Sequence, residues 1–180
     1  RFSLAGDNPQ VWALGVKDVW KVPKPLHRII HTMGWPLRGG HQYREFGGSF
    51  ICPMGDDMVT VGMVVGLDYR DSEVSPHDLL QQLKTHPLVR KVLAGGERIG
   101  WGAKTIPEGG YYALPARRSG DGILMAGDTA GFVDVPSLKG IHYAMQSGMY
   151  AARAAFQALK AGDTGIASLA AYDRMINESY

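Results

Sequence analysis

The sequence predicts an α+β fold, with a mixed sheet in the first part of the chain and helices in the last part. Segments rich in β-branched and aromatic residues, separated by Gly and Pro, recur through most of the first 126 residues, which is typical of strands. From about residue 137, apolar residues instead recur at three- and four-residue steps, as on one face of an amphipathic helix. Strands first and helices last indicate the α+β class.

The composition is that of a folded protein. With 180 residues, 45% hydrophobic and 20% charged, the chain can form one domain or parts of two and is not a disordered segment. Its net charge of +2 gives no argument for nucleic acid as a partner. The single cysteine, Cys52, excludes an internal disulfide framework and cannot by itself hold an iron–sulfur cluster, and the six histidines show no metal-ligand spacing. No stretch has the apolar length of a membrane span.

The first strands are expected over residues 11–22, 28–37, 49–54 and 58–69. The first of them is rich in Val and Trp. The fourth is a nearly continuous apolar run with many β-branched residues, which favours a central place in the sheet. The glycine-punctuated residues 38–48 should connect the second strand to the third.

A helix is expected to begin after Ser75, because Ser is a good N-cap, Pro76 suits the first helical position and Asp78 completes the spacing of a capping box. Pro87 should interrupt it, and a shorter helix over 88–94 should end at a pair of glycines. The buried stripe of the first helix is expected to be Leu79, Leu80 and Leu83.

Three more strands are expected before the last helices. They cover 97–107, 110–116 and the short buried segment 123–126, with an exposed turn over 117–122.

A long amphipathic helix is expected from Ser137 to Lys160, and a second helix from about Ile166 to the end. Small residues on the long helix should allow another backbone to approach closely; they are Gly140, Ala144, Gly148, Ala151 and Ala155. The apolar positions that recur along it are Leu138, Ile141, Met145, Met149, Ala152, Phe156 and Leu159.

An acidic residue, Asp128, follows the last buried strand and Gly127, just before a helix. The start of a helix offers unpaired N–H groups and positive partial charge, which suit an anion or a carbonyl oxygen. A carboxylate accepts hydrogen bonds from hydroxyl groups. A ligand that carries a polyol beside a ring that becomes anionic on reduction fits both, and reduced flavin with its ribityl chain is such a ligand. The alternative is that Asp128 only caps the helix.

The segment GDTAGFVDVPSLKGIHYAMQSGMYAA (127–152) resembles the second flavin-binding segment of the glutathione-reductase-like flavoproteins. More narrowly, it is similar to the electron transfer flavoprotein–ubiquinone oxidoreductase family. The resemblance continues, in the same order, through HTMGWPL, FGGSF, VGMVVGLDYRD, THPLVRKVLAGGERIGWGAKTIPEGG and KGIHYAMQSGM. It covers nearly the whole chain.

The resemblance implies an oxidoreductase that takes electrons from reduced electron transfer flavoprotein and passes them to membrane ubiquinone, with one FAD and one 4Fe-4S cluster. It implies a quinone- or substrate-binding domain over 1–115 and the C-terminal strand–helix part of an FAD-binding domain over 116–180. Gly47 and Gly48 match the glycine pair that contacts ubiquinone. The positions that match the flavin-binding segment are Gly127, Asp128, Ala130, Gly131, Asp134, Lys139 and Gly140. No catalytic side chain is assigned.

The chain departs from the family pattern at several places. Asp134 stands where Asn is expected, and a negative charge near the flavin ring would disfavour its reduction. Phe46 stands where many members carry Tyr, and the connection RGGHQYRE is longer than usual. The alternative role for Gly47 and Gly48 is to form a bulge or turn in the sheet.

The dinucleotide fingerprint and the cluster cysteines of the family do not occur in the chain. We therefore expect an internal piece of a longer protein, with both features outside it, and a piece that is inactive alone. The resemblance implies a monotopic protein on a membrane surface: the mitochondrial inner membrane in a eukaryote or the cytoplasmic membrane in a bacterium. Two alternatives are an FAD-dependent geranylgeranyl reductase-like enzyme and a noncatalytic quinone- or lipid-binding module.

Overall fold

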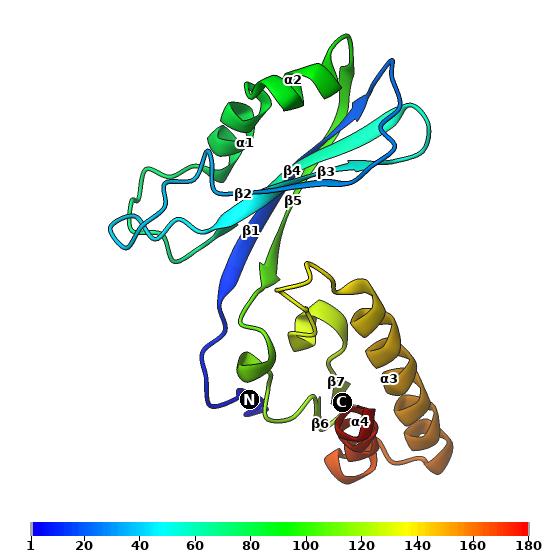
Figure 1. The fold of residues 1–180 in the computed structure, drawn as a ribbon. Helices are drawn as coiled ribbons and strands as arrows, with labels where there is room; N and C mark the ends of the chain where they lie inside the picture. The colour runs from blue at the N-terminus through cyan, green and yellow to red at the C-terminus, as the bar shows by residue number, and fades with distance from the viewer. Residues whose placement is uncertain (1, 180) are drawn as a thin grey trace. The chain divides into compact units, whose positions relative to one another are not determined.

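The computed structural model describes residues 2–179, which divide into two compact units (Figure 1). The sheet unit is Trp12–Ile106, and the helical unit combines the residues before Trp12 with those from Pro107 onward. This division differs from the expected boundary after residue 115. The segments that enter and leave the sheet pair with each other, because the Glu108 N–H donates to the Val11 carbonyl at 2.7 Å and the Gly109 N–H donates to Gln10 Oε1 at 2.6 Å.

The sheet has five strands in the order β2-β3-β4-β1-β5. The pairs β1–β4, β2–β3 and β3–β4 are antiparallel. Gly15 approaches Lys104 while Gly100 approaches Val19, so β5 also runs antiparallel to β1. The expected mixed sheet is therefore wrong, and short connections such as the one from β3 to β4 can join only antiparallel neighbours. The strands are β1 (Trp12–Lys21), β2 (Ile30–Met33), β3 (Gly47–Pro53), β4 (Met58–Gly66) and β5 (Glu97–Pro107).

Several strands differ in length from the sequence expectation, β2 and β3 among them. The strand expected over 28–37 is only β2, because Gly34 has a φ of 82° and the Leu37 N–H bonds back to the Gly34 carbonyl at 3.0 Å, which makes a turn. The strand expected to begin at residue 49 begins at Gly47, so the glycine pair lies within β3.

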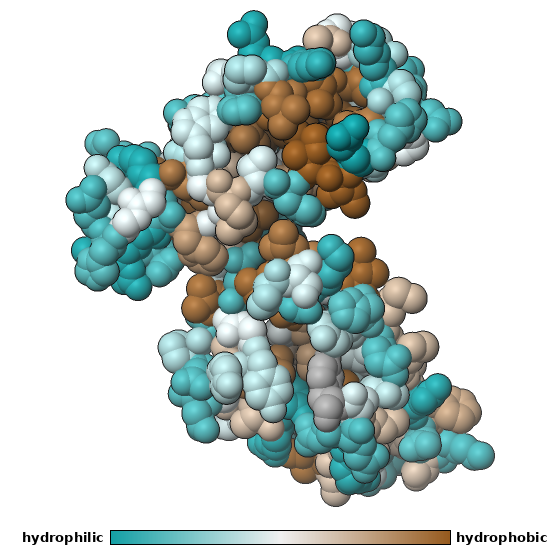
Figure 2. Space-filling view, in the orientation of Figure 1, coloured by the Kyte–Doolittle hydropathy of each residue, from teal (hydrophilic) through white to brown (hydrophobic). Residues whose placement is uncertain are grey.

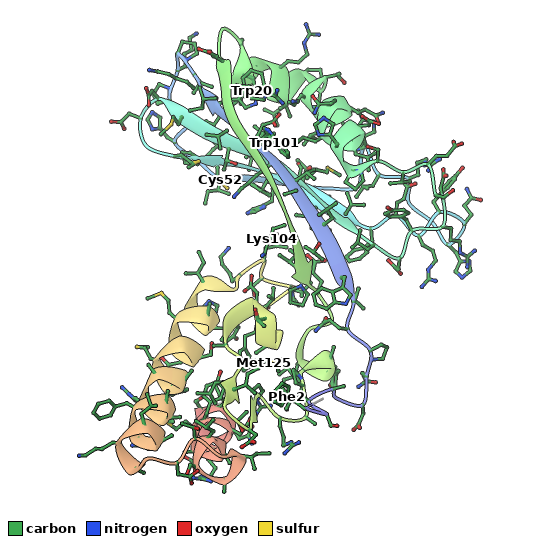
Figure 3. The ribbon with its side chains drawn as sticks, turned by 180° about the vertical axis from the view of Figure 1, so that it is seen from behind. Phe2, Trp20, Cys52, Trp101, Lys104 and Met125 are labelled. Carbon is green, nitrogen blue, oxygen red and sulfur yellow. The ribbon has the colours of Figure 1, made fainter. Side chains whose placement is uncertain are left out.

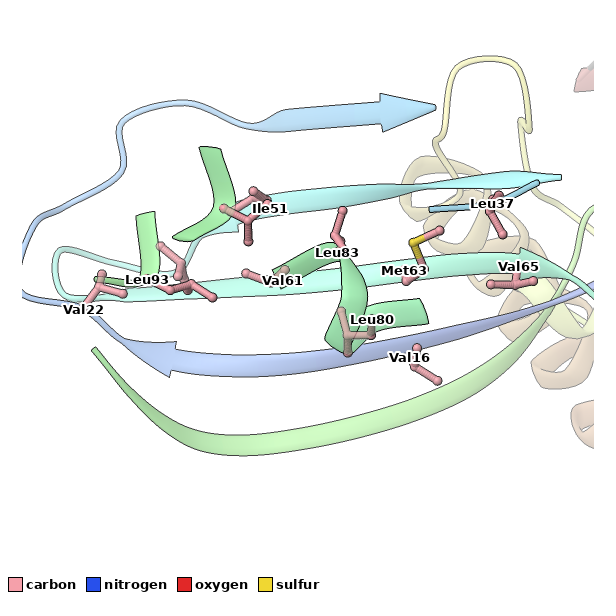
Figure 4. Close-up of a cluster of buried hydrophobic side chains, with 12 residues drawn as sticks. Val16, Val22, Leu37, Ile51, Val61, Met63, Val65, Leu80, Leu83 and Leu93 are labelled. Carbon is pink, nitrogen blue, oxygen red and sulfur yellow. The ribbon is translucent and has the colours of Figure 1, made fainter. Parts of the chain in front are cut away.

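Helices α1 (Pro76–Lys84) and α2 (Pro87–Leu93) cover one face of the sheet (Figure 1). The predicted start of α1 is confirmed, since the Asp78 N–H donates to Ser75 Oγ at 3.2 Å. Pro87 begins α2 rather than only interrupting the previous helix. The side chains buried between helices and sheet are shown in Figure 4; they include Ile51, Val61, Met63, Val65, Leu80, Leu83 and Leu93.

Asp18 is a charged side chain buried beside this core. Asp18 in β1 is 1% exposed, and its carboxylate contacts Lys84 Nζ at 2.5 Å and Arg98 Nη1 at 3.7 Å. Lys84 also lies over the ring of Trp20, with Nζ 5.5 Å from the ring centroid. A buried carboxylate is tolerated because it is paired.

The helical unit contains short elements before its two helices. They are the 3₁₀ turn η1 (Tyr111–Ala113), the hairpin strands β6 (Ser119–Gly120) and β7 (Ile123–Leu124), and the 3₁₀ turn η2 (Gly127–Ala130). The strand expected over 110–116 is wrong: Gly110 has a φ of 66°, and its carbonyl accepts from the Ala113 N–H at 3.1 Å, which closes a turn.

The turn expected to be exposed at 117–122 is partly buried. Arg118 is 7% exposed and Ser119 is 1% exposed. Their backbone N–H groups both donate to the carboxylate of Asp173, and Arg118 also forms an ion pair with it at 3.1 Å. Sequence alone did not indicate this partner, because Asp173 lies in a helix more than fifty residues away.

Helix α3 (Ile141–Ala161) packs on α4 (Ile166–Ser179). It begins later than the expected Ser137, because Asp134 and Lys139 pair through two backbone hydrogen bonds and hold the residues between them in a turn. Its buried side chains are the small Ser147, Ala154 and Ala158. The large apolar residues of the helix are exposed in this chain: Ile141, Met145, Met149, Phe156 and Leu159.

Figure 2 shows the hydrophobic surface concentrated on the sheet unit, with paler and more mixed surface over α3 and α4. Within residues 2–179, no helix has both the length and the apolar character needed to cross a membrane.

Candidate functional site

The turn η2 lies directly on α3. Gly127 has a φ of 61°, and a Cβ added there would stand 3.2 Å from the Cβ of Ala144. Gly131 ends the turn in the left-handed conformation, with a φ of 83°, and Ala130 is fully buried. Only residues that are small or free of a side chain allow this close contact. Three of the predicted flavin-segment residues, Gly127, Ala130 and Gly131, therefore shape the backbone of the turn.

Ser147 ties the turn to the helix. Its Oγ accepts from the Gly127 N–H at 2.9 Å and donates to the Tyr143 carbonyl at 2.7 Å, and the residue is 2% exposed. Ser147 is not among the residues that the sequence pattern predicts for the site. The signal that could have found it is a single hydroxyl residue among the small residues of the long helix, where a buried polar group needs partners.

Asp128 is exposed and lies beside the start of α3. Its Oδ1 is 3.3 Å from the position that a Cβ on Gly140 would occupy. Gly140 is the N-cap of α3 and, as a glycine, has no side chain with which to cap the helix. That Asp128 only caps this helix end stays an alternative prediction. The helix end and the carboxylate beside it present hydrogen-bond donors and acceptors at the same place.

Asp134 and Lys139 lie together in the turn before α3. The Asp134 N–H donates to the Lys139 carbonyl at 2.7 Å, and the Lys139 N–H returns a bond at 3.0 Å. Hydrogen bonds from the side chain and backbone of Ser137 lower the pKa of Asp134, and the nearby charges of His142 and Lys139 lower it further. Asp134 therefore carries its negative charge close to the start of the helix.

The predicted quinone residues Gly47 and Gly48 lie in β3, at the end nearest the loop from β2. A Cβ on Gly47 would stand 2.0 Å from the Val64 carbonyl oxygen, and one on Gly48 would stand 2.2 Å from the Thr32 carbonyl oxygen. Contacts below 3 Å with backbone atoms cannot be relieved by a side-chain rotation. Strand packing alone therefore requires glycine at both positions.

Aromatic rings and glycines share the sheet face opposite α1 and α2. The ring of Phe50 lies over Gly62, where an added Cβ would stand 2.1 Å from a ring carbon, and the ring of Phe46 lies over Gly66 in the same way. Met33, which pairs with Gly48, is 74% exposed. These six residues define the open face. It offers apolar walls, as a flat ring needs.

Figure 3 shows the side chains of both units, seen from the side opposite to that of Figure 1. Cys52, Trp101 and Lys104 lie on the strands of the sheet unit, whereas Met125 lies beside the turn that leads to α3. The Met125 carbonyl accepts from Tyr172 Oη at 2.8 Å, which links β7 to α4.

The nine predicted binding residues fall into two groups in the structure. Gly47 and Gly48 are in the sheet unit, and the other seven are around η2 and the start of α3.

Glu108 follows β5, and burial raises its pKa above the ordinary value of 4.5. The folded chain therefore binds a proton at this carboxyl group more tightly than the unfolded chain does. The protonated group contributes stability to the fold below its ordinary pKa, and this stability is lost as the pH rises through the pKa of the group in the folded state.

We expect Glu108→Gln to stabilise the chain at about pH 7 and to have little effect at about pH 3.5. Thermal unfolding at the two pH values, with exposed Glu97→Gln as the control, measures this. An equal effect at both would contradict it.

The fold is shared with several solved structures. A geranylgeranyl bacteriochlorophyll reductase-like protein from Thermoplasma acidophilum superposes with a TM-score of 0.69 at 19% identity, over 94% of this chain and 40% of that one. The flavin-dependent brominase Bmp2 superposes with a TM-score of 0.61 at 23% identity, over 94% of this chain and 42% of that one. At these identities the likeness shows the fold alone. It confirms the predicted α+β class.

The sequence is similar to mitochondrial electron transfer flavoprotein-ubiquinone oxidoreductases. It is 42% identical to the protein of Arabidopsis thaliana, over 85% of this chain and 24% of that protein. The probable enzyme of Schizosaccharomyces pombe is 46% identical, over 86% and 24% respectively, and the human protein is 41% identical, over 88% and 26%. The chain thus spans about a quarter of the length of these relatives.

The family described as "ETF-QO, ubiquinone-binding" matches residues 12–106. These are the residues of the sheet unit and more than half of the chain. The chain therefore belongs to the electron transfer flavoprotein–ubiquinone oxidoreductase family.

Proposed function

We propose that this chain supplies the ubiquinone-binding sheet and the second flavin-binding segment of an electron transfer flavoprotein–ubiquinone oxidoreductase. In the whole protein, electrons pass from reduced electron transfer flavoprotein to membrane ubiquinone through FAD and a 4Fe-4S cluster whose ligands lie outside this chain. The observation that carries the proposal is the family match over the sheet unit. It favours this function over a geranylgeranyl reductase-like enzyme and over a noncatalytic binding module.

The residues around η2 fit FAD, which supplies the redox chemistry when it is bound. Asp128 is exposed, and its carboxylate can accept hydrogen bonds from the ribityl hydroxyl groups. The start of α3 directs N–H groups and positive partial charge toward the same place, where they can hydrogen-bond the flavin ring. Lys139 is exposed beside this helix end and adds positive charge, whereas the negative charge of Asp134 opposes reduction of the ring.

The open face of the sheet fits a quinone head group. Phe46, Phe50 and Met33 provide apolar surface. Gly47 and Gly48 are half-buried and carry no side chain of their own, which favours a close approach of a quinone oxygen to the backbone. The same two glycines are required by strand packing, and the two roles are compatible. A quinone with an isoprenoid tail is dissolved in a membrane, so we propose that the whole protein lies on a membrane surface. The relatives named above are mitochondrial.

Asp128→Ala in the full-length protein tests the flavin half of the proposal. We expect FAD to bind roughly 10- to 100-fold more weakly, because a hydrogen bond to a charged group contributes about 1.5–3 kcal/mol. The measurement is bound FAD by absorbance and by titration of the apoprotein. Asp121→Ala, which removes an exposed carboxylate from the β6–β7 turn, is the matched control and should keep FAD.

Unchanged FAD affinity in Asp128→Ala would show that this carboxylate does not hold the flavin. The complete function is tested by adding reduced electron transfer flavoprotein and then ubiquinone to the purified full-length protein. The flavin absorbance should bleach and then return. A colourless protein that FAD cannot reconstitute would refute the proposal.

A further inference from the structure

The loop between β2 and β3 leads directly into the proposed quinone residues. It covers residues 34–46, and its last residue, Phe46, contributes an aromatic ring to the open face. Near its beginning the loop is anchored in the core, because Leu37 is 7% exposed and belongs to the hydrophobic cluster of the sheet unit. The contacts at the other end of the loop, next to Phe46, therefore determine where Phe46 lies.

Glu45, immediately before Phe46, is held by one residue from the beginning of the loop. Its side chain is 0% exposed, and its carboxylate accepts three hydrogen bonds from Arg38. The Arg38 N–H donates to Oε2 at 2.6 Å, while Nε and Nη2 donate to Oε1 at 2.8 Å and 2.5 Å. A buried carboxylate with this many charge-assisted bonds has one favourable position.

Arg38 also joins the loop to the segment after β4. Its Nη2 contacts Asp71 Oδ2 at 2.6 Å, and its guanidinium lies 4.5 Å from the centroid of the Tyr43 ring. The Tyr43 carbonyl accepts from the Arg70 N–H at 3.0 Å. The hydrogen bond from Arg38 lowers the pKa of Asp71, so this carboxylate stays charged at neutral pH. The two ends of the loop and the residues after β4 are therefore linked through one planar side chain.

The link reaches the open face through the backbone. The carbonyl of Phe46 accepts from the Gly66 N–H at 2.9 Å, and its ring lies over the same glycine. Since Glu45 is the neighbour of Phe46, a shift of the Glu45 carboxylate would move both the ring and the start of β3. Gly47 has little freedom to absorb such a shift, because it packs against the Val64 carbonyl.

We infer that Arg38 is a positioning residue for quinone binding: through Glu45, it sets the place of Phe46 and of the Gly47–Gly48 backbone at the edge of the open face. This inference rests on the proposed function, and it names the part of the chain that determines how a quinone head group is seated. It assigns no contact between Arg38 and the quinone. Arg38 acts on Phe46 through Glu45.

The test compares Arg38→Met with wild type in the full-length protein, using a short-tail ubiquinone as the probe. We expect the KM for the quinone to rise about tenfold, because small displacements of positioning groups have effects of that size or larger. The rate at which reduced electron transfer flavoprotein reduces the flavin, and kcat at saturating quinone, should stay close to wild type. A raised KM with an unchanged kcat is not expected for a residue that only maintains the fold.

Arg44→Met is the matched control. Arg44 is in the same loop and pairs with Asp68 at 3.3 Å, but both side chains are about half exposed, so the variant should keep the wild-type KM. Arg38→Lys is the second variant and protects the test if Arg38→Met fails to fold. Lys keeps the charge but cannot make the forked contact with Glu45, so the KM should rise by a smaller factor.

The outcomes separate the inference from the proposed function. If the wild-type protein does not reduce ubiquinone, the proposed function fails. If it does, and folded Arg38→Met or Arg38→Lys keeps the wild-type KM, only the inference is overturned. The inference is also overturned if flavin reduction falls as much as the quinone reaction, because Arg38 would then act on the whole protein.

Discussion

Lys84→Met is expected to lower the free energy of unfolding of the sheet unit by about 3–5 kcal/mol, the usual cost of breaking a buried ion pair by removing one partner. Asp18 is 1% exposed, and without Lys84 its carboxylate keeps only Arg98, at 3.7 Å, among the charged partners within residues 2–179. A charge buried with so distant a partner is unfavourable. Urea unfolding followed by tryptophan fluorescence measures the change, because all four tryptophans, Trp12, Trp20, Trp35 and Trp101, lie in the sheet unit.

Two further variants identify the cause of this loss. Lys21→Met breaks the pair of Lys21 with Asp57, in which both side chains are more than half exposed, and should change the stability by less than about 1 kcal/mol. Asp18→Val combined with Lys84→Met removes both charges and should be more stable than Lys84→Met alone. If the double variant were less stable than the single one, the burial of an unpaired carboxylate would not be the reason.

Gly48→Ala is expected to destabilise the sheet unit by about 3 kcal/mol or more, at or above the upper end of the usual range for overpacking. The added Cβ would stand 2.2 Å from the Thr32 carbonyl oxygen, so β2 and β3 must separate locally. The effect should appear in unfolding experiments without any quinone, because it arises from the sheet itself. A ubiquinone titration of the folded full-length variant should show weaker quinone binding as a second consequence.

Gly100→Ala is the matched control for this prediction. Gly100 also lies in a strand of the sheet, but its nearest contact for an added Cβ is the Val19 Cβ at 3.9 Å. Alanine should therefore be tolerated and can stabilise the chain by about 0.5 kcal/mol through the lower entropy of the unfolded state. If Gly48→Ala were as stable as Gly100→Ala, the strand contact would not explain the glycine at position 48.

Local signals in the sequence predicted the elements that depend on local chemistry. Ser75, Pro76 and Asp78 correctly indicated the start of α1, and the Val- and Trp-rich segment correctly indicated β1. The strand expected over 110–116 failed because a glycine with positive φ closes a turn there, which outweighs the β propensity of its tyrosines. The start of α3 was misplaced because the bridge between Asp134 and Lys139 takes the residues before it out of the helix.

The family, the α+β class and most strand and helix positions could be predicted from the amino-acid sequence, because short-range patterns of capping, turn and apolar residues report directly on local structure. The folded structure was needed to show which face of α3 is buried, why Gly48 must lack a side chain, and that Arg38 contacts Glu45 and Asp71. These features depend on contacts between residues far apart in the chain. A sequence pattern shows which side chains are present, whereas their contacts over long sequence separations depend on how the whole chain folds.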